Sequence, residues 1–150
     1  MEHTSPIVVG VSRRTGSPEA VRWAVAEARM RNTTVLAVTA WRGPRPPTAP
    51  AGRPPAILPH EEAFAEEEQR LATELAAQFG GDLAGTPITF SLRRGKAAAV
   101  LLEAAVGAQL LVLDSPRSGN ASTLGKSLIA PKVVFSAPCP VVLMPPNRPA

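Results

Sequence analysis

The sequence predicts one doubly wound α/β domain, in which a five-stranded, mostly parallel sheet carries helices on both faces. The chain has 150 residues, the usual size of a single domain, and 45% of them are hydrophobic. Short apolar runs, typical of strands buried on both faces, recur along it. Segments with a helical spacing of apolar residues separate them, and this alternation favours parallel strands joined by right-handed crossovers.

The first strand and the first helix have the clearest signals. The strand is predicted at residues 7–11, an almost wholly apolar run. The helix is predicted at residues 17–31, with Ser17 as N-cap, Pro18 at the first helical position and Glu19 at the positive end of the helix dipole. Its apolar face combines Val21, Ala24, Val25 and Ala28.

The remaining elements continue the alternation. Residues 42–60 form a proline-rich loop, because prolines neither pair in a sheet nor continue a helix. The helix at 61–79 has an acidic first half, interpreted as a solvated face, and a second half that ends at two glycines. Further strands are predicted at 35–40, 88–92, 110–113 and 141–144, and further helices at 97–105 and at 127–136, where Pro131 interrupts the helix.

Composition argues against several functional classes. No apolar run approaches the roughly 20 residues that cross a bilayer, and no secretory leader is recognisable, so we expect a cytoplasmic protein without a membrane partner. The lone Cys139 has no cysteine to pair with and is expected to be a small buried hydrophobe. The net charge of +4 does not predict nucleic-acid binding, because the aromatic residues are scattered as packing residues. They are Trp23, Trp41, Phe64, Phe79, Phe90 and Phe135.

Three stretches resemble the universal stress protein family. They are Pro6-Ile-Val-Val-Gly-Val-Ser12 with Trp23-Ala24 after it, the run from Gly95 to Leu113, and Ala137-Pro-Cys-Pro-Val-Val-Leu143. The resemblance covers almost the whole chain and implies a flavodoxin-like sheet with strand order 3-2-1-4-5. It also implies a homodimer formed by the last strand, through Val141, Val142, Leu143 and Met144.

The resemblance also locates a nucleotide site with altered residues. In ATP-binding members an Asp ends the first strand, and the loop after the fourth strand offers three glycines and a hydroxyl residue to the phosphates. The family's spacing places Asp114, Arg117 and Ser127 at the glycines, Leu128 at the hydroxyl residue and Ser12 at the Asp. Each change adds a clash or removes a contact. We therefore expect no cofactor, with ATP binding at best weakly.

The candidate ligand-binding residues include five more positions, Arg13, Ala40, Leu113, Gly119 and Lys126. The run from Gly119 to Ser127 resembles a P-loop, but its two glycines are one residue too far apart, so a P-loop NTPase is disfavoured. His3 and His60 form no recognisable triad or metal cluster, and no catalytic or metal-binding residue is predicted.

The expected function is a non-catalytic regulatory or interaction module of the stress response, and the alternative is a nucleotide-binding (ATP or AMP) or other anion-binding regulator. Nine of the 16 Lys and Arg residues fall in loops at the carboxyl ends of the strands. They are Arg13, Arg14, Arg42, Arg45, Arg93, Arg94, Lys96, Arg117 and Lys126. We therefore expect an acidic protein or an anionic small molecule to bind around four of them, Arg13, Arg14, Arg117 and Lys126. The alternative is that these cations serve only solubility, and Asp114 would then pair with Arg13 or Arg117.

Overall fold

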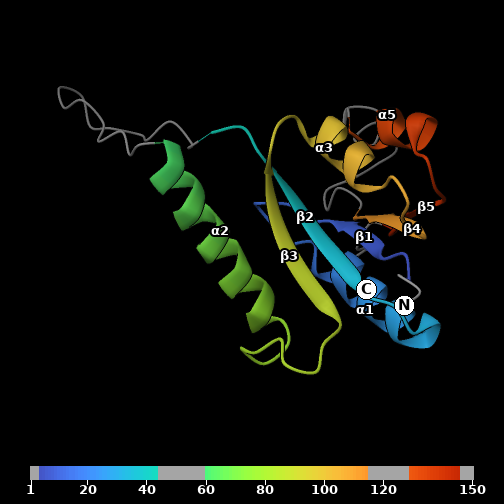
Figure 1. The fold of residues 1–150 in the computed structure, drawn as a ribbon, viewed down its shortest axis with the longest axis horizontal. Coiled ribbons are helices and arrows are strands. Elements are labelled where there is room, and N and C mark those ends of the chain that lie inside the picture. The colour runs from blue at the N-terminus through green and yellow to red at the C-terminus, as the bar shows by residue number, and fades with distance from the viewer. Residues whose placement is uncertain (1–3, 44–59, 115–128, 146–150) are drawn as a thin grey trace.

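The computed structural model describes residues 4–43, 60–114 and 129–145, which form a five-stranded parallel sheet between two layers of helices (Figure 1). The strand order is β3-β2-β1-β4-β5, so the predicted doubly wound, flavodoxin-like fold is confirmed. The strands are β1 (Ile7–Gly10), β2 (Val35–Trp41), β3 (Ile88–Arg94), β4 (Leu110–Leu113) and β5 (Val141–Leu143). The helices are α1 (Pro18–Arg31), α2 (His60–Ala77), α3 (Ala97–Ala104) and α5 (Ile129–Ser136).

Strand β1 is the centre of the sheet. It pairs in parallel with β2 on one side and with β4 on the other, so that Val9 lies level with both Ala37 and Val112. Ile7, Val8 and Val9 are all completely buried. A strand covered on both faces needs apolar side chains at successive positions, which explains the continuous run in the sequence.

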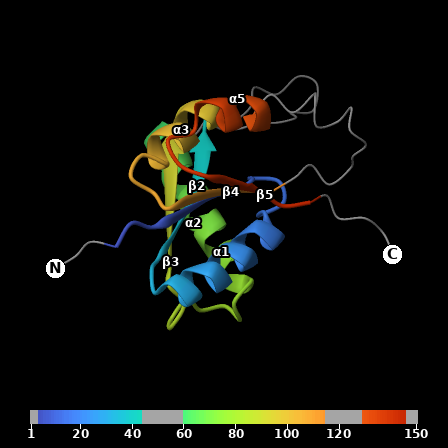
Figure 2. The same ribbon diagram turned by 90° about the vertical axis from the view of Figure 1, so that its right-hand side faces the viewer.

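Two layers of helices cover the sheet, with α1 and α2 on one face and α3 and α5 on the other (Figure 2). The predicted apolar face of α1 packs against β1, β2 and β4, and its four residues Val21, Ala24, Val25 and Ala28 are buried. On the opposite face, Val100 and Leu101 of α3 and Val133 of α5 pack against Val8 and Leu111. Successive side chains along each strand point to opposite faces of the sheet, so they contribute to two separate apolar cores.

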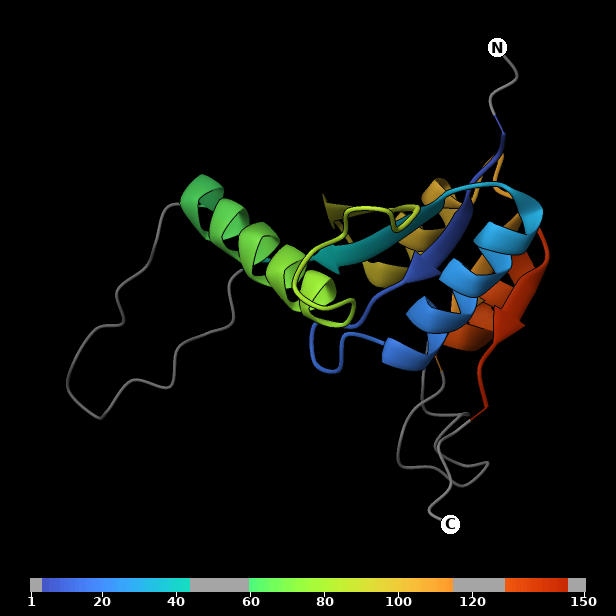
Figure 3. The ribbon, with the colours of Figure 1, turned by 90° about the horizontal axis from the view of Figure 1, so that it is seen from below.

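Helix α2 lies at the β3 edge of the sheet, away from α1 (Figure 3). A third cluster fixes it there, formed by Trp41, Ala63, Leu71 and Leu92, which are all buried. The ring of Trp41 meets that of Phe64 edge to face, with centroids 5.3 Å apart. Aromatic packing at the ends of β2 and β3 therefore sets the position of the first turns of α2.

Some predicted boundaries and environments were wrong. His60 begins α2 instead of ending the proline-rich loop, and residues 44–59 lie outside the described part of the chain. Pro131 does not interrupt α5, because it occupies the first turn, where its missing N–H has no partner to lose. Phe135, expected to pack, is 91% exposed because it lies on the outer side of α5.

We predict that Leu111→Ala lowers the free energy of unfolding by about 2–5 kcal/mol, because a fully buried side chain on β4 leaves a cavity when truncated. Urea denaturation measures the change. Met30→Ala is the control, since Met30 is 80% exposed and its truncation is expected to cost less than about 0.5 kcal/mol. Equal losses in the two variants would contradict the assignment of β4 to the core.

Candidate functional site

The carboxyl ends of β1, β2 and β4 lie side by side, and five of the ten predicted ligand-binding residues lie at these strand ends: Ser12, Arg13, Ala40, Leu113 and Asp114. Ser12 follows β1 and Asp114 follows β4, and these two strands are hydrogen-bonded neighbours, as predicted. Strands β2 and β4 flank β1 on opposite sides. The carboxyl ends of β1 and β4 are therefore the topological switch point, where sheets of this kind bind ligands. The side chains of Ala40 and Leu113 instead pack in the core beneath α3. The other five predicted residues, Arg117, Gly119, Lys126, Ser127 and Leu128, lie outside the described residues.

The loop from β1 to α1 is closed by its own hydroxyl groups. The backbone N–H of Ser12 donates to Oγ of Ser17 at 3.0 Å, and the backbone N–H of Arg14 donates to Oγ of Ser12 at 3.1 Å. The N–H of Ser17 donates to Oγ1 of Thr15 at 3.1 Å, and the N–H of Gly16 donates to the carbonyl of Ser12 at 2.9 Å. Both the amide and the hydroxyl of Ser12 are therefore engaged inside the loop.

Ser17 occupies the predicted N-cap position of α1, but its hydroxyl does not cap the helix. Its backbone is left-handed, with φ at 44°, whereas a capping serine needs an extended backbone to reach the helical N–H groups. The side chain, buried within the loop, instead accepts the bond from Ser12. Nothing in the sequence distinguishes these two uses of a serine before Pro18.

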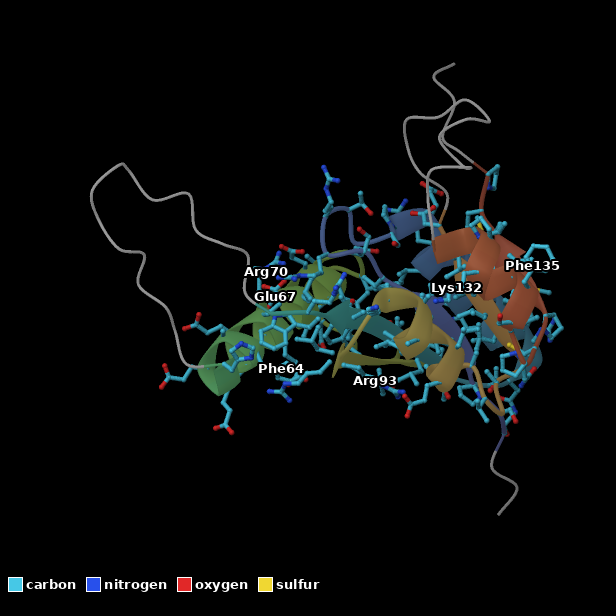
Figure 4. All side chains as sticks on the ribbon, turned by 90° about the horizontal axis from the view of Figure 1, so that it is seen from above. Phe64, Glu67, Arg70, Arg93, Lys132 and Phe135 are labelled. Carbon is cyan, nitrogen blue, oxygen red and sulfur yellow. The ribbon has the colours of Figure 1, made fainter. Side chains whose placement is uncertain are left out.

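Arg13 is held by an ion pair that crosses from this loop to α2. Its Nε donates to Oε1 of Glu67 at 2.9 Å, and the two side chains are only 21% and 14% exposed. Glu67 also accepts a bond from Nε of Arg70, which lies beside it on α2, at 3.1 Å (Figure 4). Arg70 also pairs with Glu74 at 2.7 Å. The ion-pair partner of Arg13 in the described residues is Glu67 of α2. The expected pairing of Asp114 with Arg13 or Arg117 stays a prediction, because Arg117 lies outside the described residues.

The surroundings of Glu67 keep it ionised. The hydrogen bond from Arg70 lowers the pKa of Glu67 from its ordinary value, burial acts against this, and Arg13 lowers it further. The prediction of a solvated acidic face is correct for the exposed Glu61, Glu62, Glu66 and Glu68, but wrong for Glu67. The spacing of Glu67 and Arg70 was visible in the sequence. The contact with Arg13 was not, because 54 residues separate the two.

The described residues offer binding groups at this edge and no clustered metal ligands. No group of three or more His, Cys, Asp or Glu side chains is placed to hold a metal ion in residues 4–43, 60–114 and 129–145. His60 lies against Trp41, the last residue of β2, with ring centroids 5.4 Å apart. Burial raises the pKa of the Cys139 thiol, which disfavours the reactive thiolate. No helix in the described part is long and apolar enough to cross a membrane.

Known proteins similar to this chain in sequence or structure are universal stress proteins. The model of the universal stress protein family matches residues 3–145. The structure is similar to that of the universal stress protein UspA from Lactobacillus plantarum, with 18% identity, a TM-score of 0.66, and coverage of 97% of this chain and 100% of that one. No curated protein matches the chain.

Two further similar structures are complexes with nucleotides. One is a universal stress protein in complex with cAMP, with 20% identity, a TM-score of 0.62, and coverage of 97% of this chain and 100% of that one. The other is the universal stress protein from Archaeoglobus fulgidus in complex with dAMP, with 22% identity, a TM-score of 0.55, and coverage of 96% and 100%. At these identities the likeness establishes the fold.

We predict that Glu67→Gln lowers the free energy of unfolding by about 1 kcal/mol at pH 7, because Arg13 and Arg70 lose their shared carboxylate. The pKa of Glu67 is depressed in the folded state, so this stabilisation is complete above the unfolded-state pKa and is lost as the pH falls through the folded-state pKa. Urea denaturation at pH 7 and pH 3 measures the difference. Glu66→Gln, at an exposed neighbouring position, is the control, and a loss at Glu67 that persists undiminished at pH 3 would argue against the ion pair.

Proposed function

The chain belongs to the universal stress protein family, and we propose that it acts in the stress response as a non-catalytic module that binds a partner. In this proposal the ATP site of the family is lost or strongly weakened, and the protein uses no cofactor. A cytoplasmic location remains a prediction from the sequence.

The observation that supports this proposal most is the closed loop after β1. Its position corresponds to the Asp of ATP-binding members, but here Ser12 donates its amide to Ser17 and accepts a bond from Arg14. A nucleotide that used these groups would first have to break both bonds, each worth about 1 kcal/mol. The neighbouring Arg13 is also occupied, by Glu67. Asp114 adds a negative charge at the adjacent strand end, where a triphosphate would need positive or neutral groups.

A second candidate function is regulation by a nucleoside monophosphate. Similar proteins have been solved with cAMP and with dAMP, and the described part of this chain keeps the switch-point arrangement of β1 and β4. A monophosphate carries less charge than ATP and is less affected by Asp114. The sequence between residues 115 and 128 contains Arg117 and Lys126 and no acidic residue, so it can contribute cations to such a site.

We predict that calorimetry with purified protein gives a dissociation constant for ATP of about 1 mM or weaker, with or without magnesium. The triple variant Asp114→Gly, Arg117→Gly, Ser127→Gly is expected to bind ATP at least tenfold more tightly, because it restores the family's glycines. Titration with AMP distinguishes the second candidate function. Tight, magnesium-dependent ATP binding by the unaltered protein would refute the loss of the site.

We also propose that two copies pair through β5, as the resemblance implied. This strand forms an edge of the sheet and pairs with β4 on its inner side. Val141 and Val142 are partly exposed and Leu143 is 44% exposed, so a partner strand would cover apolar surface as well as strand-edge backbone groups. Met144 extends the proposed interface by one residue. Phe135 projects from α5 at this end of the molecule (Figure 4) and adds apolar surface beside it.

We predict that Val142→Asp converts a dimer into a monomer at micromolar concentration, because a carboxylate would be buried between two edge strands. Sedimentation velocity measures the change. Val106→Asp introduces the same charge at a position that is 71% exposed and follows α3, and it should leave the dimer intact. A monomeric unaltered protein, or equal dissociation of both variants, would count against the β5 interface.

A further inference from the structure

Four cationic residues meet where β2 and β3 end. The strands pair in register, with Ala40 level with Arg93 and Trp41 level with Arg94, and the N–H of Gly95 donates to the carbonyl of Trp41 at 3.0 Å. That bond brings together the residues that follow each strand. The resulting β2–β3 cationic cluster consists of Arg42, Arg93, Arg94 and Lys96.

The cluster covers both faces of the sheet edge. Arg93 is level with Ala40, which packs in the core beneath α3, and Arg93 accordingly lies beside α3 (Figure 4). Its Nε donates to Oγ of Ser91 at 3.2 Å. Arg94 lies on the other face, where its guanidinium stacks 4.1 Å from the ring centroid of Phe64. Both guanidinium groups are thus positioned by neighbours that carry no charge.

The charge of the cluster is not neutralised within the described residues. The four ion pairs in this part of the chain involve Arg13, Arg31 and Arg70, and none of them includes a member of the cluster. The first turn of α3, which follows Lys96, contains no acidic residue. The sequences of 44–59 and 115–128 contain no Asp or Glu either, so neither segment can supply a carboxylate. Arg13, by contrast, is neutralised by Glu67.

An acidic surface adjoins this cluster. Contacts of Arg94 with Phe64 and of Trp41 with His60 fix the first turns of α2 beside the ends of β2 and β3. The same half of α2 carries four exposed glutamates, Glu61, Glu62, Glu66 and Glu68. One end of the molecule therefore presents a cationic cluster next to an anionic helix surface.

We propose that the β2–β3 cationic cluster docks an acidic segment of a partner protein. The inference rests on the proposed function and specifies the chemistry of the partner. A uniform polyanion such as nucleic acid would be repelled by the exposed glutamates of α2. The nearby aromatic rings also offer bases no stacking surface, because Trp41 is 2% exposed and Phe64 is covered by Arg94. A polypeptide can place carboxylates on the cluster and basic side chains on α2, which makes the two surfaces jointly selective.

The test uses a fluorescein-labelled peptide with five glutamates, two glycines and five lysines, titrated with the full-length protein at 20 mM and 150 mM NaCl while anisotropy is recorded. We expect saturable binding that weakens with salt. The variant Arg93→Gln, Lys96→Gln should raise the dissociation constant about tenfold at low salt, since two charge-assisted contacts are lost. The matched control Arg22→Gln, Arg29→Gln removes the same charge from exposed, unpaired positions on α1 and should change it less than about twofold.

Three results would overturn the proposal. They are the absence of peptide binding at 20 mM NaCl, equal weakening in the two double variants, and equally tight binding of a labelled 20-base-pair DNA duplex that depends on Arg93 and Lys96. Nucleotide calorimetry on the same Arg93→Gln, Lys96→Gln protein provides a separate readout. A failure of the docking surface leaves that measurement unchanged, whereas tight ATP binding would contradict the proposed function and leave the peptide result intact.

Discussion

The burial of β1 between two parallel neighbours is the constraint on which the rest of the structure depends. Ile7, Val8 and Val9 are completely buried, and their side chains alternate between the core beneath α1 and the core beneath α3. A parallel strand in the centre of a sheet requires helices on both faces, because each face would otherwise expose apolar side chains. In the same arrangement β2 lies on one side of β1 and β4 on the other. The loop after β1 and Asp114 after β4 therefore lie at the same carboxyl edge of the sheet. The position of the candidate site therefore follows from the packing of the core.

The hydrogen bonds and ion pairs of the side chains at that edge determine which of them can contact a ligand. Serine and threonine hydroxyls take up the backbone donors of the loop after β1, and Glu67 takes up the charge of Arg13. Groups that could contact an anion are thus used to stabilise the loop and to connect it to α2. The cations at the ends of β2 and β3 differ from Arg13 in that their charge is not neutralised within the described part of the chain. Arg94 stacks on the ring of Phe64, and Arg93 donates to the hydroxyl of Ser91. The two halves of one sheet edge consequently suit different tasks, a closed loop at β1 and an open charged surface at β2 and β3.

The fold was predictable from the sequence because its signals are local. Apolar runs located four of the strands and an alternating pattern located β3, all to within two residues, and the face of Val21 and Val25 located the buried side of α1. The strand order came from the family resemblance. What could not be predicted depends on contacts between distant segments or on backbone angles. The pairing of Arg13 with Glu67 requires α2 to lie beside the loop, and the left-handed backbone of Ser17 redirects a hydroxyl that the sequence marks as a cap. The exposure of Phe135 depends on the rotation of α5 about its axis, which a short helix containing a proline does not reveal.

We propose that the loop after β1, which is closed by its own hydrogen bonds, does not open to a nucleotide. The most direct measurement is amide NMR of the region from Ser12 to Ser17, with hydrogen exchange and chemical shifts recorded in the absence and presence of excess ATP. We expect the Ser12 amide, which donates to Ser17, to be protected from exchange, and we expect its chemical shift to be unchanged by the nucleotide. Rapid exchange of the Ser12 amide, or a large saturable shift of the Ser12 and Ser17 amides on addition of ATP, would contradict it.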